Sequence, residues 1–445
     1  MTTTDRLPTE APGAWPLLGH IPLMARSPLD FFQRLQGCGP VVRIRIGSRP
    51  AYVVTRPDLV RRLLTADQDV FDKGGTAFEK ARIILGNGLA TCPAADHAQQ
   101  RPLLQPAFHH DRLQQYAVVF RDTAAEITGS FQPGRPFRLD EQVRRIATLA
   151  ASRTLVSADQ AAPVAAQISR AVPDLMQGVF WRMLMPGRLF PHLPLPLNRR
   201  FDQQMARTRA VLDPLVSHYR ASKTDYGDLL SMVVAAFEHE KDPQQAVYDQ
   251  VLTILMGAVE TTASTVLWTL RLLDQHPHVA ERMLTEIRQV LGERLPDHGD
   301  VARLPYTRCV MTETLRLYPP LWLLNRITTA PVAWSEGSIP AGADVYFSPY
   351  ALHRDGEVFA DPDRFDPDRW SPQRVTATQR QAFFALGAGR RKCIGDTFGM
   401  TEATIATVAI VNRWKLRYQD DTSTGRPALR MVLLAPPTTV RVEPR

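Results

Sequence analysis

A long apolar segment between Gln244 and Gln275 constrains the fold more than any other feature of the sequence. Its middle, from Val251 to Ala258, is apolar almost all round, and the segment ends before Pro277, a residue that does not continue a helix. A helix that is hydrophobic on every face is buried. The sequence therefore predicts a central, buried helix.

The rest of the chain adds more helices and a few short strands. The pattern is helical from Pro57 to about Val290 except for loops, the clearest being the proline-rich stretch 186–196. The β-like runs 41–46 and 51–55 flank a Gly-Ser-Arg-Pro turn and predict a hairpin. Further expected elements are helices at 28–38, 306–317 and 396–414, β structure at 321–350, and irregular coil at 353–382. We expect a mainly α protein with small β-sheets, in which residues 1–25 form a proline-rich coil and residues 26–445 a single domain.

Charge and cysteine content exclude several classes of protein. The net charge of +8 comes with no basic block interleaved with aromatic residues, so nucleic-acid binding is not expected. The cysteines Cys38, Cys92, Cys309 and Cys393 form no CxxC pair, which argues against a disulfide framework or a zinc site. No long apolar run opens the chain, so we expect no signal peptide, no membrane anchor and a cytoplasmic location.

The segment around Cys393 has the pattern of a reactive or metal-binding thiol. Gly387 and Gly389 precede Cys393 and allow a tight turn with positive φ, and a helical pattern follows from Asp396. A helix N-terminus and neighbouring cations favour a thiolate. Two other roles remain open for this cysteine. A buried structural thiol is common, and a nucleophile would need a histidine partner that the sequence does not reveal.

Residues 386–395 resemble the heme-binding loop of the cytochrome P450 family, whose pattern is Phe-Gly-x-Gly-x-Arg-x-Cys-x-Gly. The chain differs at the first position, where Leu386 replaces phenylalanine. The resemblance implies the P450 fold, with heme b between the long central helix and the cysteine loop. It also implies that the Cys393 thiolate ligates the iron, which in such proteins favours O–O cleavage.

The central helix carries a second motif of the same family. Residues 257–262, Gly-Ala-Val-Glu-Thr-Thr, resemble its oxygen-binding segment. The resemblance implies that the Thr261 hydroxyl takes part in O₂ activation and that Glu260 supplies protons through water. Alone, the two small residues of this segment would indicate only a notch for helix packing.

Two further groups of residues match the family. Glu313 and Arg316 fit its Glu-x-x-Arg helix, and the resemblance makes Arg369 the third member of a buried structural network. The resemblance also implies that four cationic residues bind the heme propionates, because cations suit carboxylates. These four are His97, Arg101, Arg326 and Arg391.

The reaction implied by the resemblance is insertion of one oxygen atom from O₂ into a C–H bond. Electrons would come from a ferredoxin and a ferredoxin reductase with NADPH or NADH, and we expect a monomer. The residues expected to line an apolar substrate pocket are Phe71, Phe78, Leu255, Met256, Val259 and Leu323.

Residues 71–75, 105–109 and 193–201 look like segments of actinobacterial P450s that oxidise cyclic sesquiterpenes, such as pentalenene oxygenase. This resemblance implies a pentalenene-like sesquiterpene substrate, oxidised at one carbon in one or more steps. The alternatives are a P450 hydroxylase of a macrolide or fatty acid, and a heme-binding protein of P450 fold without oxygenase activity.

Overall fold

The computed structural model describes residues 8–156, 158–184, 190, 193–419 and 427–445. The chain is mainly helical with small sheets, which confirms the predicted class. It forms two compact units, one of Met1–Glu79 and Leu315–Ile394 and the other of Lys80–Thr314 and Gly395–Arg445.

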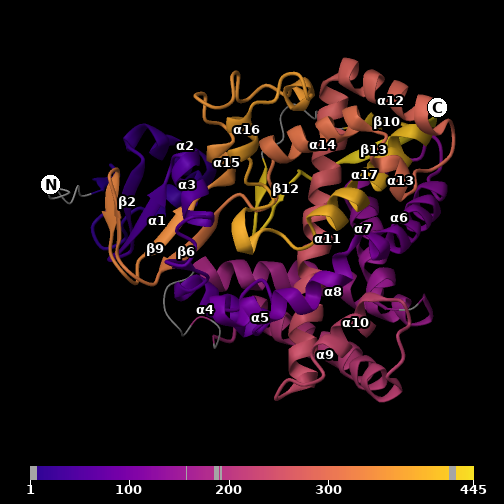
Figure 1. Ribbon diagram of the computed structural model, residues 1–445. Coiled ribbons are helices and arrows are strands. Elements are labelled where there is room, and N and C mark those ends of the chain that lie inside the picture. The colour runs from indigo at the N-terminus through magenta and orange to yellow at the C-terminus, as the bar shows by residue number, and fades with distance from the viewer. Residues whose placement is uncertain (1–7, 157, 185–189, 191–192, 420–426) are drawn as a thin grey trace. The chain divides into compact units, whose positions relative to one another are not determined.

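The first unit is built on a sheet with the strand order β1-β2-β3-β9-β6-β4. These strands are β1 (Thr9–Glu10), β2 (Val41–Ile46), β3 (Arg49–Val54), β9 (Asp344–Phe347), β6 (Leu324–Thr328) and β4 (Phe71–Asp72). β2 and β3 pair antiparallel, which confirms the predicted hairpin. β3 then pairs parallel with β9, so segments far apart in the sequence lie side by side, as the indigo and orange elements of Figure 1 show.

The first unit also contains short helices. They are α1 (Ile21–Arg26), α2 (Pro28–Arg34), η1 (Leu35–Cys38), α3 (Pro57–Leu64), α15 (Pro349–Leu352), η4 (Pro367–Trp370), α16 (Ala377–Gln381) and η5 (Gly389–Arg391), and a separate hairpin contains β7 (Val332–Trp334) and β8 (Gly337–Ile339). The apolar face of α3 meets the sheet in a core that includes Val60, Val345, Phe347 and Phe384. This burial fixes the segment that leads into the cysteine loop.

The second unit contains the longer helices. They are α4 (Gly75–Leu85), which starts in the first unit, α5 (Ala94–Leu104), η2 (Gln105–Phe108), α6 (His110–Gly129), α7 (Leu139–Leu155), α8 (Ala158–Leu184), α9 (Pro196–Ser222), α10 (Leu229–Ala236), α11 (Pro243–Gln275), α12 (Pro277–Leu291), α13 (His298–Val301), α14 (Pro305–Leu317), which ends in the first unit, and α17 (Asp396–Arg413). Its small sheets pair β5 (Phe137–Arg138) and β10 (Trp414–Tyr418) with β13 (Thr439–Pro444), and β11 (Ala428–Leu429) with β12 (Leu433–Leu434).

Helix α11 is the predicted central helix. It starts at Pro243, where the side chain of the N-cap residue Asp242 accepts a hydrogen bond from the backbone N–H of Gln245. It packs against α7 and α17, and most of its residues are buried. Of the described helices, only α11 is long and apolar enough to cross a membrane, and most of its apolar window is buried. The helix is therefore the core helix of the second unit.

Two predictions about irregular segments differ in outcome. Residues 353–382 contain only η4 and α16, which confirms the long irregular coil. The prediction of coil throughout residues 1–25 is wrong for β1 and α1, because Thr9 and Glu10 pair with β2 and Pro22 occupies the first turn of α1, where proline is tolerated. The predicted loop 186–196 lies largely outside the described residues.

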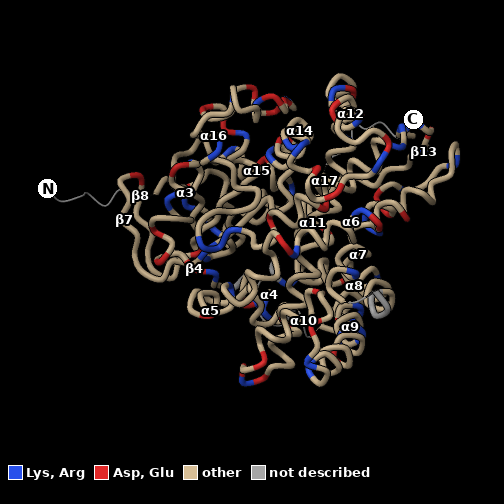
Figure 2. Tube along the Cα trace, turned by 45° about the vertical axis from the view of Figure 1, so that its right-hand side comes forward, with Lys and Arg blue, Asp and Glu red and all other residues tan. Residues whose placement is uncertain are grey.

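Charged residues are distributed in the way expected of an ordinary globular surface. In Figure 2 the blue and red stretches are interspersed with tan along the chain. Several surface cations contact acidic neighbours, such as Arg43 with Glu10 and Arg374 with Asp366. Acidic neighbours therefore compensate part of the positive charge on the surface.

Candidate functional site

The cysteine loop of the first unit has the predicted glycine turn. Gly387 and Gly389 have φ values of 71° and 66°, in the region that side chains disfavour. The backbone N–H of Cys393 donates a 2.9 Å hydrogen bond to the carbonyl of Leu386, which closes the loop. Cys393 itself is exposed, and α17 begins three residues later at Asp396. An exposed cysteine in a fixed loop can serve as a ligand, whereas the buried-thiol alternative does not fit.

The loop is attached to its surroundings just before its start and again in its middle. The N–H of Phe384 donates to Nε2 of the buried His353 at 2.8 Å, and the N–H of Arg390 donates to the side-chain oxygen of Gln68 at 3.1 Å. A Cβ at Gly389 would collide with the backbone oxygen of Leu64, so this close contact with α3 requires glycine. The position of Cys393 is therefore set by neighbours that the motif does not include.

Two of the predicted propionate-binding cations, Arg326 and Arg391, lie in the same unit as Cys393. Nη2 of Arg391 is 2.9 Å from Oδ1 of Asp72, the last residue of β4. Arg326, on β6, is buried, and its Nη1 donates to the carbonyl of Asn325 at 2.7 Å. Burial, with a smaller contribution from the like charge of Arg391, lowers the pKa of Arg326 to about 10, although Asp72 acts in the opposite direction.

This cluster fits a heme carboxylate. Within the described parts of the chain, Arg326 forms no ion pair, although burying a guanidinium without an anion costs free energy. A propionate near Arg326 and Arg391 would supply that anion. The residues of the first unit therefore match both the iron ligand and the propionate partners that heme b requires.

Thr261 and Glu260 lie on α11 in the second unit. The Thr261 hydroxyl donates a 2.5 Å hydrogen bond to the carbonyl of Gly257, one turn earlier. Glu260 is buried, and its Oε1 lies 3.2 Å from Nε of Arg144 on α7. No local pattern in the sequence links Arg144 to α11, so this contact could not be predicted.

An accessible stripe runs along α11 beside Thr261. Ile254, Ala258 and Thr261 are partly exposed and Gly257 is exposed, at the three- and four-residue spacing of one helix face. A Cβ added at Gly257 would meet nothing within 4 Å. The two small residues therefore leave open space along this face of an otherwise buried helix.

Thr262, the neighbour of Thr261 in the sequence, contacts a second carboxyl group. The Thr262 hydroxyl is 3.4 Å from Oε2 of Glu402 on α17, and Glu402 is fully buried. Burial raises the pKa of Glu402 well above its ordinary value, and the hydrogen bond from Thr262 only partly opposes this shift. Glu402 was also missed in the sequence, since a single glutamate in an apolar helix carries no motif.

The remaining predicted heme-binding and network residues lie on α5, α14 and η4. His97 and Arg101 lie on α5 in the second unit, where His97 is buried and Arg101 is half-buried. Glu313 and Arg316 are fully buried on α14, and Arg369, on η4, is nearly so. Arg316 donates hydrogen bonds to the carbonyls of His353, Pro362 and Arg364. This arginine therefore stabilises the irregular coil.

The predicted substrate residues are mostly internal. Phe71 belongs to the core of the first unit, where the centroid of its ring lies 5.7 Å from that of the Trp334 ring. Leu255, Met256 and Val259 are buried on α11, away from the accessible stripe. Phe78 and Leu323 are half-buried. That these residues line the substrate pocket stays a prediction. Ile254 and Ala258, which lie on the accessible stripe, are better placed to contact a substrate.

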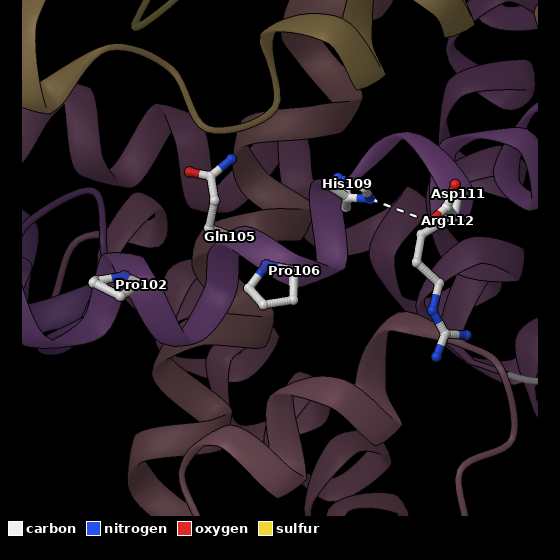
Figure 3. A pocket seen from close by; sticks show the side chains of 6 residues that line it. All are labelled: Pro102, Gln105, Pro106, His109, Asp111 and Arg112. Atoms are coloured by element: carbon white, nitrogen blue, oxygen red, sulfur yellow. Dashed lines mark ion pairs between the residues drawn. The ribbon is translucent and has the colours of Figure 1, made fainter.

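A separate hollow lies on the second unit, where α5 gives way to η2 and α6. Its lining is Pro102, Gln105, Pro106, His109, Asp111 and Arg112, shown in Figure 3. Nδ1 of His109 lies 3.4 Å from Asp111, and Arg112 binds Asp225 at 2.9 Å. None of the predicted heme or catalytic residues lines this hollow, so it is not the reaction site.

The chain is similar over nearly its whole length to several known proteins. The chain is 42% identical over 442 residues to cyclooctatin synthase of Streptomyces melanosporofaciens, a match that covers 98% of this chain and 96% of that protein. It is 38% identical over 411 residues to cyclooctat-9-en-7-ol 5-monooxygenase of the same organism, with coverage of 92% and 89%. It is 37% identical over 424 residues to pentalenene oxygenase of Streptomyces avermitilis, with coverage of 95% and 94%.

The fold also matches a solved structure. The crystal structure of the cytochrome P450DA heme domain covers 99% of both chains with a TM-score of 0.86, at 24% sequence identity. The family model described as Cytochrome P450 matches residues 8–443. Because this match spans nearly the whole chain, the protein belongs to the cytochrome P450 family and is a heme-thiolate monooxygenase.

Proposed function

We propose that this monooxygenase hydroxylates a cyclic terpene and that Cys393 is its iron ligand. The carrying observation is that three relatives at 37–42% identity are named for cyclooctatin, cyclooctat-9-en-7-ol and pentalenene. The accessible stripe of α11 supports an apolar substrate, because Ile254, Gly257 and Ala258 offer no charged group to it.

Each part of the site has a defined task in this proposal. When bound, heme supplies O₂ activation, so that one oxygen atom enters a C–H bond and the other leaves as water. Arg326 and Arg391 bind the propionates, together with His97 and Arg101. Thr261 presents its hydroxyl on the accessible stripe, and Glu260 delivers protons through water.

Two substrates are the strongest candidates within the terpene class. The first is a pentalenene-like sesquiterpene hydrocarbon, oxidised at one carbon in one or more steps. The second is a cyclic terpene alcohol, which is favoured by the higher identity to the two cyclooctatin-related enzymes than to pentalenene oxygenase. The two candidates differ by a hydroxyl group that would need a hydrogen-bond partner in the pocket.

Spectral titration tests the substrate class. Cyclic terpene hydrocarbons and alcohols are added to the purified holoenzyme, and the heme Soret band is followed for displacement of water from the iron. Turnover with ferredoxin, ferredoxin reductase and NADPH, with products identified by mass spectrometry, then tests oxygenation. A Soret shift with a fatty acid or a macrolide, and with none of the terpenes, would overturn the substrate proposal.

We infer the location from the family, and the redox partner from the family and from exposed cations near Cys393. Arg390, which pairs with Asp69, and Lys392 lie in the cysteine loop just before Cys393 and are exposed. Cations at this position suit an acidic ferredoxin. We propose that the protein works in the cytoplasm as a monomer, receiving electrons from a separate ferredoxin and its reductase.

A further inference from the structure

The loop between α4 and α5, residues 86–93, is tied to α11 by two side chains of that helix. The backbone N–H of Leu89 donates to Oε1 of Gln250 at 3.0 Å, and the backbone N–H of Asn87 donates to Oδ2 of Asp249 at 2.8 Å. Both Asp249 and Gln250 are buried. Two consecutive residues of α11 therefore bind backbone groups of the loop that would otherwise need water as a partner.

A second glutamine completes the tie. Nε2 of Gln250 donates to Oε1 of Gln100 on α5 at 2.9 Å, and Nε2 of Gln100 donates to the carbonyl of Asn87 at 2.9 Å. The two buried amides and the loop backbone thus form a closed ring of hydrogen bonds. Because loss of one buried member leaves the others unsatisfied, such a ring fixes the loop in one position.

The loop also lies too close to α11 for a side chain at Gly88. A Cβ at this buried position would collide with the hydroxyl of Thr253 and would lie 2.7 Å from the backbone oxygen of Asp249. The backbone of the loop therefore rests directly on α11.

The tie lies in line with the accessible stripe. One face of α11 carries, at intervals of four, three and four residues, Gln250, Ile254, Gly257 and Thr261. Gln250 is 1% exposed, whereas Ile254 is partly exposed and Gly257 is exposed. The open part of this face thus begins after Gln250, where the loop closes its N-terminal end. From Ile254 to Thr261 the open part is about 10 Å long, at about 1.5 Å per residue.

We propose that Gln250 is a specificity-determining residue, which holds the 86–93 loop as the end wall of the substrate site and so selects compact substrates over long linear ones. The inference rests on the proposed function and extends it from the terpene class to the shape of the substrate. A fused-ring terpene oxidised beside Thr261 fits the open length of the stripe. An extended chain of the same mass reaches the wall and must fold back, which costs conformational entropy. The wall therefore discriminates against linear chains by steric exclusion.

Cedrol and farnesol, a cyclic and a linear alcohol of the same molecular formula, separate shape from composition. Each is titrated into the purified holoenzyme, and the Soret band gives its dissociation constant. We expect the wild type to bind cedrol about tenfold more tightly than farnesol or better. Gln250→Leu keeps the volume of the side chain but releases Leu89 and Gln100. In this variant the preference should fall about tenfold, the order expected when one or two buried hydrogen bonds are lost.

Two further variants separate the wall from a general effect of substitution. Gln244→Leu is the matched control, because Gln244 also lies on α11 but donates to the carbonyl of Asp213 on α9. It should keep the wild-type preference. Gly88→Ala displaces the loop from the opposite side, so it should reproduce the result of Gln250→Leu, and the double variant should add little to either. Urea unfolding of each variant measures lost stability, which by itself does not change the ratio of the two dissociation constants.

The remaining outcomes distinguish the wall from the substrate class. A wild-type preference in either Gln250→Leu or Gly88→Ala would overturn the proposal, as would an equal change in Gln244→Leu. If Gln250→Leu does not fold, Gly88→Ala decides. If no cyclic terpene binds the wild type, the proposed substrate class fails, and gain of farnesol binding in Gln250→Leu still decides whether the wall exists. If cedrol binds and is oxidised but the preference does not respond to the variants, only the wall fails.

Discussion

Nη2 of Arg391 lies 2.9 Å from Oδ1 of Asp72, although 319 positions separate the two residues. Asp72 ends β4, which pairs with β6, and β6 carries Arg326. The carboxylate of Asp72 also acts on the charge of Arg326. One acidic residue on the sheet thus binds a cation of the cysteine loop and makes a small opposing contribution to the pKa of a buried cation.

Arg326→Gln should weaken retention of heme. A charge-assisted hydrogen bond contributes about 1.5–3 kcal/mol, so we expect heme to dissociate roughly 10- to 100-fold faster. Transfer of heme to an excess of an apo-globin, followed by absorbance, measures this rate. Arg390→Gln is the matched control, because Arg390 is exposed and pairs with Asp69. Equal transfer rates in wild type and Arg326→Gln would remove Arg326 from the propionate site.

Gly389→Ala should destabilise the protein far more than Gly387→Ala. Both glycines have positive φ, which costs a residue with a Cβ about 1 kcal/mol. Only at Gly389 would the Cβ also collide with the backbone oxygen of Leu64, whereas at Gly387 the nearest atom is 3.6 Å away. We expect a loss of roughly 3 kcal/mol or more for Gly389→Ala, measured as the change in the free energy of unfolding in urea. Similar losses of stability in both variants would show that the positive φ, and not the collision with Leu64, determines the cost of the added Cβ.

Patterns in the sequence predicted those elements that depend only on residues close together along the chain. The apolar run of α11, the hairpin of β2 and β3, and the glycine turn before Cys393 each follow from spacing within a few residues. The pairing of Thr9 and Glu10 with β2 did not, because a strand of two residues is too short to show an alternating side-chain pattern. The contacts of Arg144 with Glu260 and of Asp72 with Arg391 depend on tertiary packing, so no sequence spacing indicated them.

Stability should decrease below about pH 6.5 because of His353. Burial, and to a smaller extent the charge of Arg316, lowers the pKa of His353 from 6.5 to about 3. Its Nε2 accepts the N–H of Phe384, and its Nδ1 contacts the carbonyl of Arg316 at 3.0 Å, so the folded protein needs the neutral ring. Below pH 6.5 the unfolded chain binds a proton that the folded chain does not. The stability present above pH 6.5 is therefore lost as pH falls towards 3, by about 1.4 kcal/mol per pH unit.

Urea unfolding at pH 7.5, 6.5 and 5.5 checks this sign and slope. His353→Gln keeps a donor and an acceptor but does not titrate, so its stability should vary less over this range than that of the wild type. His109, an exposed residue, supplies the control variant His109→Gln, which should follow the wild type. Parallel pH curves for wild type and His353→Gln would exclude His353 as the source of acid sensitivity.

Thr261→Ala should uncouple oxygen consumption from product formation without loss of heme. The variant removes the hydroxyl that lies on the accessible stripe of α11, so we expect about tenfold less product per NADPH and correspondingly more peroxide. Thr265→Ala is the matched control, because the Thr265 hydroxyl makes the same kind of bond, to the carbonyl of Thr261 at 2.8 Å, but its residue is buried. Loss of coupling in both variants would mean that helix geometry matters. Loss in Thr261→Ala alone, with recovery in Thr261→Ser, would assign the effect to the hydroxyl at position 261.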